Sequence, residues 1–182
     1  VVQSGDSVTW TQAFDNWNVG TGKTLTPAGV VTDGNSGNNY SYTYTPVSTG
    51  VITAKPITVT PDSGQTKVYN KAGADPTLTY AAIPPALESG DSLTGSLARA
   101  AGTDVGNYAI NLGTLANSNY DISLAVTPVN FSITARPLTV TAATDTKEYN
   151  RSTASAGVPT LTSGVVQSGD SVTWTQAFDN WN

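Results

Sequence analysis

Short runs in which apolar and polar residues alternate recur along the chain. Three clear examples are ITVT at residues 57–60, FSIT at 131–134 and LTVT at 138–141. Successive side chains of a β-strand point to opposite faces, so each run predicts a strand with one buried face and one hydrated face. The abundance of Thr and Val in these runs is typical of half-buried strands.

Turn-forming residues separate these runs at short intervals. Gly, Pro, Asn and Asp cluster in DSGQ (62–65), IPPALESGD (83–91) and DGNSGNN (33–39), and such clusters mark the ends of strands. Residues 93–101 are the best helix candidate, but the alternation around them favours a strand. The pattern therefore predicts an all-β fold with two-layer packing.

The chain also repeats itself. VVQSGDSVTWTQAFDNWN occupies residues 1–18 and again residues 165–182. Identity over so long a stretch excludes chance. The shift from position 1 to position 165 therefore defines the long period of the sequence.

A second, degenerate repeat of about half that length lies within the period, as expected for an array of similar modules. The matching pairs are VITAKPITVT (51–60) with SITARPLTVT (132–141), KVYNKAGADPTLTY (67–80) with KEYNRSTASAGVPTLT (147–162), SGDSLTGSLARAAGTDVGNYAI (89–110) with SGDSVTWTQAFDNWNVGTGKTL (4–25), and NYDISLAVTPVNFSITA (119–135) with NYSYTYTPVSTGVITA (39–54).

These matches predict three segments. Residues 55–135 form one complete β module, residues 1–54 the rear part of a second type, and residues 136–182 the front part of that second type. We expect the sequence to be one period of a longer covalent chain, with head-to-tail strand exchange between separate copies as the alternative.

The repeat also explains NVGTGKT (18–24), which resembles the end of a phosphate-binding loop. The first glycine of that motif is replaced by Trp17, and the following LTPAGVV is poor helix material. The segment aligns with DVGNYAI (104–110) and is predicted to be a strand.

The links between modules are very short. VITA continues through Lys55 and Pro56 into ITVT, and SITA continues through Arg136 and Pro137 into LTVT. A residue before proline favours an extended backbone, so we expect a rod-like array of small tandem β-sandwich modules. Immunoglobulin-like topology fits the strand spacing, and a β-grasp-like module is the alternative.

The amino-acid composition limits the reactions and partners that we expect for this chain. The sequence contains no Cys, His or Met, carries a net charge of −5, and has 12% charged residues. Without His or Cys, cysteine nucleophiles, disulfides and Ser-His-Asp triads are excluded, and we expect no enzyme activity. The charge does not suggest a nucleic-acid partner, and no apolar run is long enough for a membrane span.

The ordered motifs resemble tandem MBG and YDG repeats of large bacterial surface adhesins and filamentous-haemagglutinin-like exoproteins. The MBG-type resemblance covers residues 55–135, and the YDG-type resemblance covers the split module. The tyrosine-aspartate-glycine signature is replaced here by Tyr149, Asn150 and Arg151. The resemblance implies an extracellular stalk or filament on a bacterial cell surface, with no known catalysis.

Aromatic residues are the main candidates for ligand binding or contact between modules. Exposed rings could stack on sugars, whereas large aromatic side chains more often pack in cores or interfaces. Tyrosines at alternating positions are expected to share one strand face. The candidates are Trp10, Trp17, Tyr40, Tyr42, Tyr44, Trp174 and Trp181.

Two further motifs have structural explanations beside functional ones. The stretch Asp33–Asn39 offers oxygen ligands at Ca²⁺-like spacing but lacks the closing glutamate of an EF-hand loop. A Gly/Asn-rich turn explains this loop without metal, so no cofactor is expected. Lys67 and Lys147 lie near asparagines and could form isopeptide bonds only if a buried carboxylate were also present.

We therefore expect a structural repeat of an adhesin stalk or extracellular filament, which provides reach and stiffness. The expected partners are neighbouring identical repeats, in the same chain or in head-to-tail copies, and other filaments. The alternative is a module that binds glycans or a host surface through exposed Trp and Tyr side chains.

Overall fold

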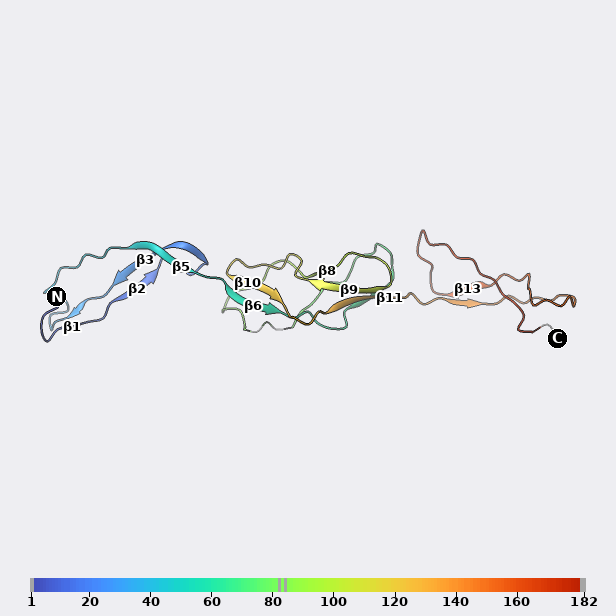
Figure 1. Cartoon of the computed structure of the whole chain (residues 1–182), viewed down its shortest axis with the longest axis horizontal. Helices are drawn as coiled ribbons and strands as arrows, with labels where there is room; N and C mark the ends of the chain where they lie inside the picture. Colours follow the sequence, from blue (N-terminus) through green and yellow to red (C-terminus); the bar gives the residue numbers. More distant parts are fainter. Residues whose placement is uncertain (1, 82, 84, 181–182) are drawn as a thin grey trace. The chain divides into compact units, whose positions relative to one another are not determined.

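A computed structural model describes residues 2–81, 83 and 85–180 (Figure 1). Within these ranges the chain contains strands and no helix, which confirms the predicted all-β class. The chain divides into two compact units, each built from three segments. The first unit comprises Val1–Thr60, Ala81–Gly95 and Thr114–Ala125, and the second comprises Pro61–Tyr80, Ser96–Gly113 and Val126–Asn182.

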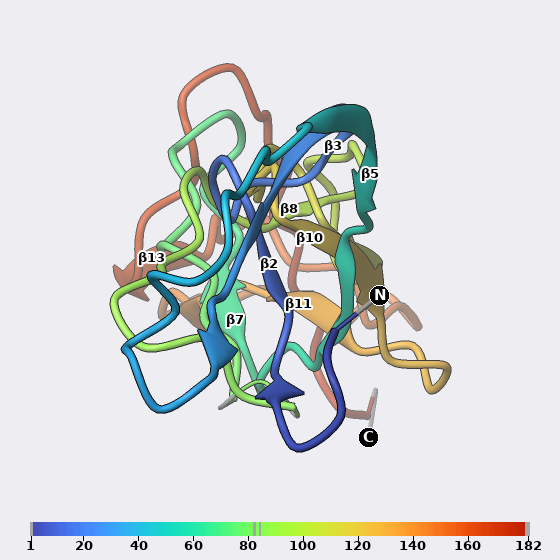
Figure 2. The same ribbon diagram turned by 90° about the vertical axis from the view of Figure 1, so that its left-hand side faces the viewer.

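Three small sheets form the first unit. β3 lies between β2 and β5 in an antiparallel sheet (Figure 2), β1 pairs antiparallel with β4, and β6 pairs parallel with β10. The strands are β1 (Ser7–Val8), β2 (Thr11–Phe14), β3 (Gly20–Ala28), β4 (Val31–Thr32), β5 (Val47–Ile52), β6 (Lys55–Val59) and β10 (Tyr120–Leu124).

Two sheets form the second unit. One has the strand order β7-β11-β9-β8, with β7 and β11 parallel and the other pairs antiparallel, and the other consists of antiparallel β12 and β13. The strands are β7 (Thr66–Val68), β8 (Ala98–Arg99), β9 (Gly106–Asn111), β11 (Asn130–Thr134), β12 (Thr139–Thr141) and β13 (Thr160–Ser163).

The alternating patterns mark the buried faces correctly where a core exists. Ile57 and Val59 of β6 and Phe131 and Ile133 of β11 are at most 2% exposed, while the residues between them are partly exposed. The buried apolar residues are Val31, Ile57, Val59, Leu115 and Tyr120 in the first unit, and Leu78, Leu97, Ile110, Phe131 and Ile133 in the second. All of these but Val31 lie within residues 57–133, and Pro159 is the other buried apolar side chain of the described flanking segments.

Several local predictions are confirmed. NVGTGKT runs into β3, and its counterpart DVGNYAI runs into β9, so the segment is a strand and not a phosphate loop. Only Thr53 and Ala54 separate β5 from β6. The region of residues 93–101 contains β8 and an isolated bridge from Thr94 to Ala116.

One local prediction is wrong. Tyr40, Tyr42 and Tyr44 were expected on one face of a paired strand, but no strand is assigned to residues 40–46. Strand assignment requires a hydrogen-bonded neighbour. No such neighbour lies beside this segment in the described part of the chain.

Candidate functional site

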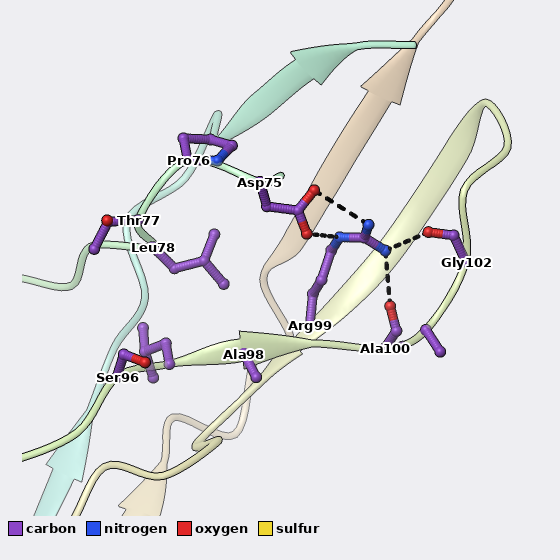
Figure 3. Close-up of a pocket in the computed structure, with 11 residues that line it drawn as sticks. Asp75, Pro76, Thr77, Leu78, Ser96, Ala98, Arg99, Ala100 and Gly102 are labelled. Carbon is purple, nitrogen blue, oxygen red and sulfur yellow. Dashed lines mark hydrogen bonds and ion pairs between the residues drawn. The ribbon is translucent and has the colours of Figure 1, made fainter. Parts of the chain in front are cut away.

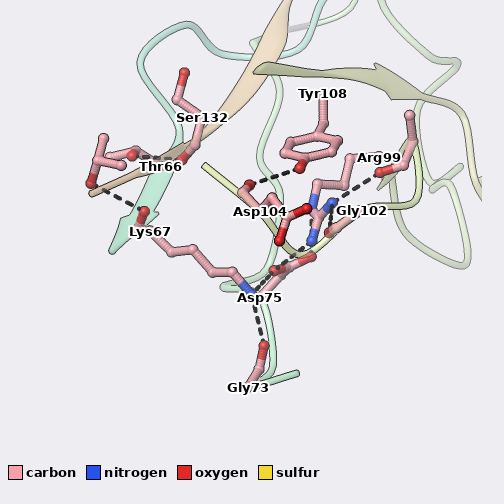
Figure 4. A network of polar contacts seen from close by, with 11 residues as sticks. Thr66, Lys67, Gly73, Asp75, Arg99, Gly102, Asp104, Tyr108 and Ser132 are labelled. Carbon is pink, nitrogen blue, oxygen red and sulfur yellow. Dashed lines mark hydrogen bonds and ion pairs between the residues drawn. The ribbon is translucent and has the colours of Figure 1, made fainter. Parts of the chain in front are cut away.

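A cluster of three charged side chains stands out in the second unit. Lys67 of β7 and Arg99 of β8 both reach Asp75, which lies in the loop after β7 (Figure 4). The Lys67 Nζ atom lies 2.7 Å from Asp75 Oδ1, and the Arg99 Nε atom lies 2.7 Å from Asp75 Oδ2. The side chains of Lys67 and Arg99 are only 8% and 10% exposed, against 31% for Asp75. One carboxylate is therefore shared between two nearly buried cations.

Further contacts hold the Arg99 guanidinium in place. It donates from Nη1 to the carbonyl oxygens of Ala100 at 2.9 Å and Gly102 at 2.8 Å (Figure 3). Its central carbon lies 4.7 Å from the ring centroid of Tyr108 and 5.3 Å from that of Phe131, distances at which a cation is attracted to an aromatic face. Arg99 thus joins the ion cluster to the apolar core of the second unit.

The electrostatics of Asp75 follow from these neighbours. Hydrogen bonds from Arg99 lower the pKa of the Asp75 carboxyl most, partial burial opposes them, and the bond from Lys67 lowers the pKa further. Asp75 is therefore held as an anion, and its proton acceptors are already engaged. This cluster stabilises structure, and its carboxylate is poorly suited to act as a general base.

A hollow of about 450 Å³ lies beside the cluster. Its walls are residues 75–78 and 96–102. The charged side chains of this lining, Asp75 and Arg99, are paired with each other. Sequence reasoning missed Asp75 and Arg99, because two positions so far apart in the chain leave no periodic signal in the sequence.

The lysines considered for isopeptide bonds have other partners. Lys67 Nζ donates to the Gly73 carbonyl oxygen at 2.7 Å in addition to its pairing with Asp75. Lys147 Nζ donates to the carbonyl oxygens of Ser152 and Ala154. A partly buried carboxylate does accompany Lys67, but it engages the amine in an ion pair.

Three of the predicted aromatic residues of the first unit, Trp10, Tyr42 and Tyr44, form one local cluster, whereas the Tyr40 hydroxyl donates to Asp6 Oδ2 at 2.6 Å. The rings of Tyr42 and Tyr44 are stacked at 6.0 Å, and Trp10 meets Tyr42 edge-on at 6.3 Å. The Tyr42 hydroxyl donates to the Gly37 carbonyl oxygen at 3.0 Å. Trp10 remains 55% exposed. The two tyrosine rings therefore stack along one segment that is not a strand, and Trp10 meets them from the segment between β1 and β2.

The other tryptophans lie in different surroundings. Trp17 is 85% exposed and lines a hollow with Phe14 and Ile52. Trp174, in the second unit, is half-buried, although its sequence neighbours match those of Trp10. Trp181 lies outside the described residues.

The oxygen-rich loop of residues 33–39 is organised by a single carboxylate. Asp33 Oδ1 accepts hydrogen bonds from the backbone amides of Asn35 and Gly37, each at 2.8 Å, and Oδ2 accepts one from Asn39 at 3.1 Å. The bond from Gly37 is the largest cause of a lowered pKa for Asp33. These bonds are those of a side-chain-stabilised turn. In the described ranges no group of three or more acidic side chains is placed to hold a metal ion.

The strands define an all-β protein. In the polar clusters around Asp75 and Asp33, the charged side chains bond to groups of the same unit. The family model described as MBG domain (YGX type) matches residues 57–131, which is less than half of the chain. This match falls within the segment whose motifs predicted an MBG-type module. No match was found among curated proteins or among solved structures. Over the described residues, no helix is long and apolar enough to cross a membrane.

Proposed function

We propose that this chain is a structural repeat of an extracellular stalk or filament on a bacterial cell surface, and that it provides reach and stiffness. The MBG family consists of β-domains typical of surface proteins, which supports the location. The recurrence of residues 1–18 at positions 165–182 supports the role as a repeat. In such arrays, stability is the sum of local folding and contacts between neighbours.

The observation that carries the proposal is the short connection between successive modules. β5 ends at Ile52 and β6 begins at Lys55, and both belong to the same compact unit. The Lys55 amide also donates to the Asn119 carbonyl oxygen at 3.0 Å, and the Val19 amide donates to Asn119 Oδ1 at 3.0 Å. A side chain of the MBG-type segment therefore bonds the preceding segment as well. A link with these restraints should transmit force and resist bending.

Small-angle X-ray scattering tests this stiffness. The matched control carries a short Gly/Ser insertion between Thr53 and Ala54, which leaves both strands intact. We expect the insertion to broaden the distribution of interatomic distances, because a flexible linker samples many orientations. Equal distributions for the two proteins would remove the basis for a stiff link.

Location can be tested separately. Brief protease treatment of intact cells that produce the protein should release peptides of this chain if it lies on the surface. The release of a cytosolic marker alone would contradict the proposed location.

The same proposal assigns no reaction to the chain and no cofactor, because the sequence lacks the His and Cys residues of the usual nucleophile and base pairs.

A second candidate function is glycan or host-surface binding, and the exposure of Trp17 favours it. An 85% exposed indole beside Phe14 and Ile52 offers a flat apolar face. Tryptophan fluorescence titrations with oligosaccharides would report such binding. The response should vanish in Trp17→Ala and persist in Trp174→Ala, and the absence of any response in the parent chain would eliminate this candidate.

A further inference from the structure

The chain contains two short links between strands of successive segments, and each link lies within one compact unit. The first link, Thr53 and Ala54, joins β5 to β6 in the first unit. The second link, residues 135–138, joins β11 to β12 in the second unit. Both lie at a basic residue followed by proline, so their sequences are similar. The contacts that cross them are different.

The polar contacts across the first link are made by neutral groups. The Val19 amide donates to Asn119 Oδ1 at 3.0 Å, and Asn119 Nδ2 donates to Asn18 Oδ1 at 3.3 Å. Dissolved ions screen interactions between charges. These neutral hydrogen bonds should therefore depend little on ionic strength.

The polar contacts across the second link centre on the carboxylate of Asp170. Lys71 Nζ lies 2.9 Å from Asp170 Oδ1, and the Tyr69 hydroxyl donates to Asp170 Oδ2 at 3.1 Å. Lys71 Nζ also donates to the Ser168 carbonyl oxygen at 2.8 Å. Tyr69 and Lys71 precede the link, whereas Ser168 and Asp170 follow it. A charged contact therefore ties the two sides of this link together.

The turn that carries Lys71 is held in place by residues before and at the link. The Tyr69 amide donates to the Thr134 carbonyl oxygen at 2.8 Å, and Arg136 Nε donates to the Tyr69 carbonyl oxygen at 2.8 Å. Lys71 itself has φ of +54°, which is uncommon for a residue other than glycine. The Lys71 ammonium is therefore presented to Asp170 from a fixed turn.

The turn that carries Asp170 leaves room for this ammonium. The Asp170 amide donates to the Gln167 carbonyl oxygen at 2.9 Å, which closes a turn around Gly169. Gly169 has φ of +83°, and a Cβ atom at this position would lie 2.8 Å from Lys71 Nζ. A side chain at position 169 would displace the lysine, so glycine permits the close approach.

The exposure of this ion pair makes it accessible to dissolved ions. The side chains of Lys71 and Asp170 are 38% and 34% exposed, whereas the two cations around Asp75 are at most 10% exposed. The hydrogen bond from Lys71 is the largest cause of a lowered pKa for the Asp170 carboxyl, so Asp170 is an anion in neutral solution. The Debye length falls from about 30 Å at 0.01 M salt to about 3 Å at 1 M salt. An exposed pair weakens over this range.

We propose that Lys71, Tyr69 and Asp170 form a salt-sensitive lock across the second link, which stiffens this link at low ionic strength and releases it at high ionic strength. The first link keeps its stiffness under both conditions. The two links of one period thus differ in how they respond to the surrounding solution. This regulation rests on the proposed role of the chain as a stiff repeat.

Distances between two spin labels in the full chain, measured by double electron–electron resonance, test the lock. The sequence has no cysteine, so labels attach only to introduced thiols. Ser63→Cys and Ser163→Cys place labels on either side of the second link, within the second unit. Thr26→Cys and Ser92→Cys place them on either side of the first link, within the first unit. All four residues are exposed.

For the second-link labels, the parent chain should give a narrow distance distribution at about 0.01 M salt and a broad one at about 1 M salt. Asp170→Asn keeps the shape of the side chain but removes its charge, so its distribution should be broad at both salt concentrations. Exchange of the charges, in Lys71→Asp with Asp170→Lys, should restore the narrow distribution at low salt. The matched control is Asp6→Asn, which alters the identical turn outside the second link and should behave like the parent. The first-link labels should give narrow distributions at both concentrations.

Equal widths for the parent and Asp170→Asn at low salt would overturn the lock. Equal broadening by salt at both links, or a broad distribution after the charge exchange, would do the same. Narrow, salt-insensitive distributions at both links would also overturn the lock but leave the proposed stiff repeat in place. Broad distributions at both links at low salt would contradict the stiff repeat as well.

Discussion

Removing the charge of Asp75 is the most direct test of the ion cluster. Asp75→Asn keeps the shape of the side chain but leaves Lys67 and Arg99, which are 8% and 10% exposed, without a counterion. Removing one partner of a buried ion pair costs about 3–5 kcal/mol of the free energy of unfolding.

We expect the loss in the free energy of unfolding to be smaller than that range, for two structural reasons. Asp75 is 31% exposed, so water already screens part of the interaction. Lys67 keeps its bond to Gly73, and Arg99 keeps those to Ala100 and Gly102. We therefore expect a loss of about 2–3 kcal/mol. For a slope of about 1–3 kcal/mol per M urea, the midpoint should fall by roughly 0.7–3 M.

Urea titration followed by far-UV circular dichroism measures the midpoint, and hydrogen–deuterium exchange locates the change. Protection should fall in β8, β9 and β11, which share the compact unit of Asp75, and remain unchanged in β2 and β3. The matched control is Glu88→Gln, because Glu88 is 71% exposed in its 2.6 Å pair with Lys55. An exposed pair contributes at most about 1 kcal/mol. The same midpoint for Asp75→Asn and Glu88→Gln would refute the argument from burial.

Three other predictions concern the same unit. First, the pKa of the Asp75 carboxyl is lowered in the folded chain, so its contribution to the free energy of unfolding is complete above the ordinary pKa of 3.8 and is lost as the pH falls through the lower folded pKa. The urea midpoint of the parent chain should therefore fall further between pH 5 and pH 2 than the midpoint of Asp75→Asn. Second, Gly102→Ala should be more destabilising than Gly64→Ala in thermal unfolding, because an added Cβ would overlap the Tyr108 ring, whereas nothing lies within 4 Å at Gly64; equal melting temperatures would contradict this. Third, Phe131→Ala should lower the free energy of unfolding by about 3–5 kcal/mol, since Phe131 is fully buried, and a urea titration would show it; a loss below about 1 kcal/mol would indicate that the site collapses around the smaller side chain.

The local sequence was sufficient to predict much of the secondary structure. The alternation in ITVT and FSIT predicted strands that the structure forms as β6 and β11, because side-chain period alone distinguishes a half-buried strand from a helix. The internal repeat predicted that NVGTGKT corresponds to DVGNYAI, and both run into strands. The side-chain alternation and the internal repeat depend only on the order of residues along the chain, so both can be read from the sequence alone.

The candidate site was less accessible to such reasoning. Lys67 was singled out beforehand, but its partner Asp75 and the opposing Arg99 were not. Arg99 lies 24 residues beyond Asp75 and reaches it only because β8 and the loop after β7 belong to one unit. Partners brought together by folding leave no spacing rule in a single sequence.

The duplicated stretch shows most clearly what the tertiary structure decided. Thr11–Phe14 forms β2 because β3 lies beside it, whereas the same four residue types at positions 175–178 form only an isolated bridge, at Ala177. The alternating pattern determined which side chains could share a face. Whether that face became part of a sheet depended on a second strand that supplies the hydrogen-bonding partners, because a strand cannot satisfy its backbone groups alone.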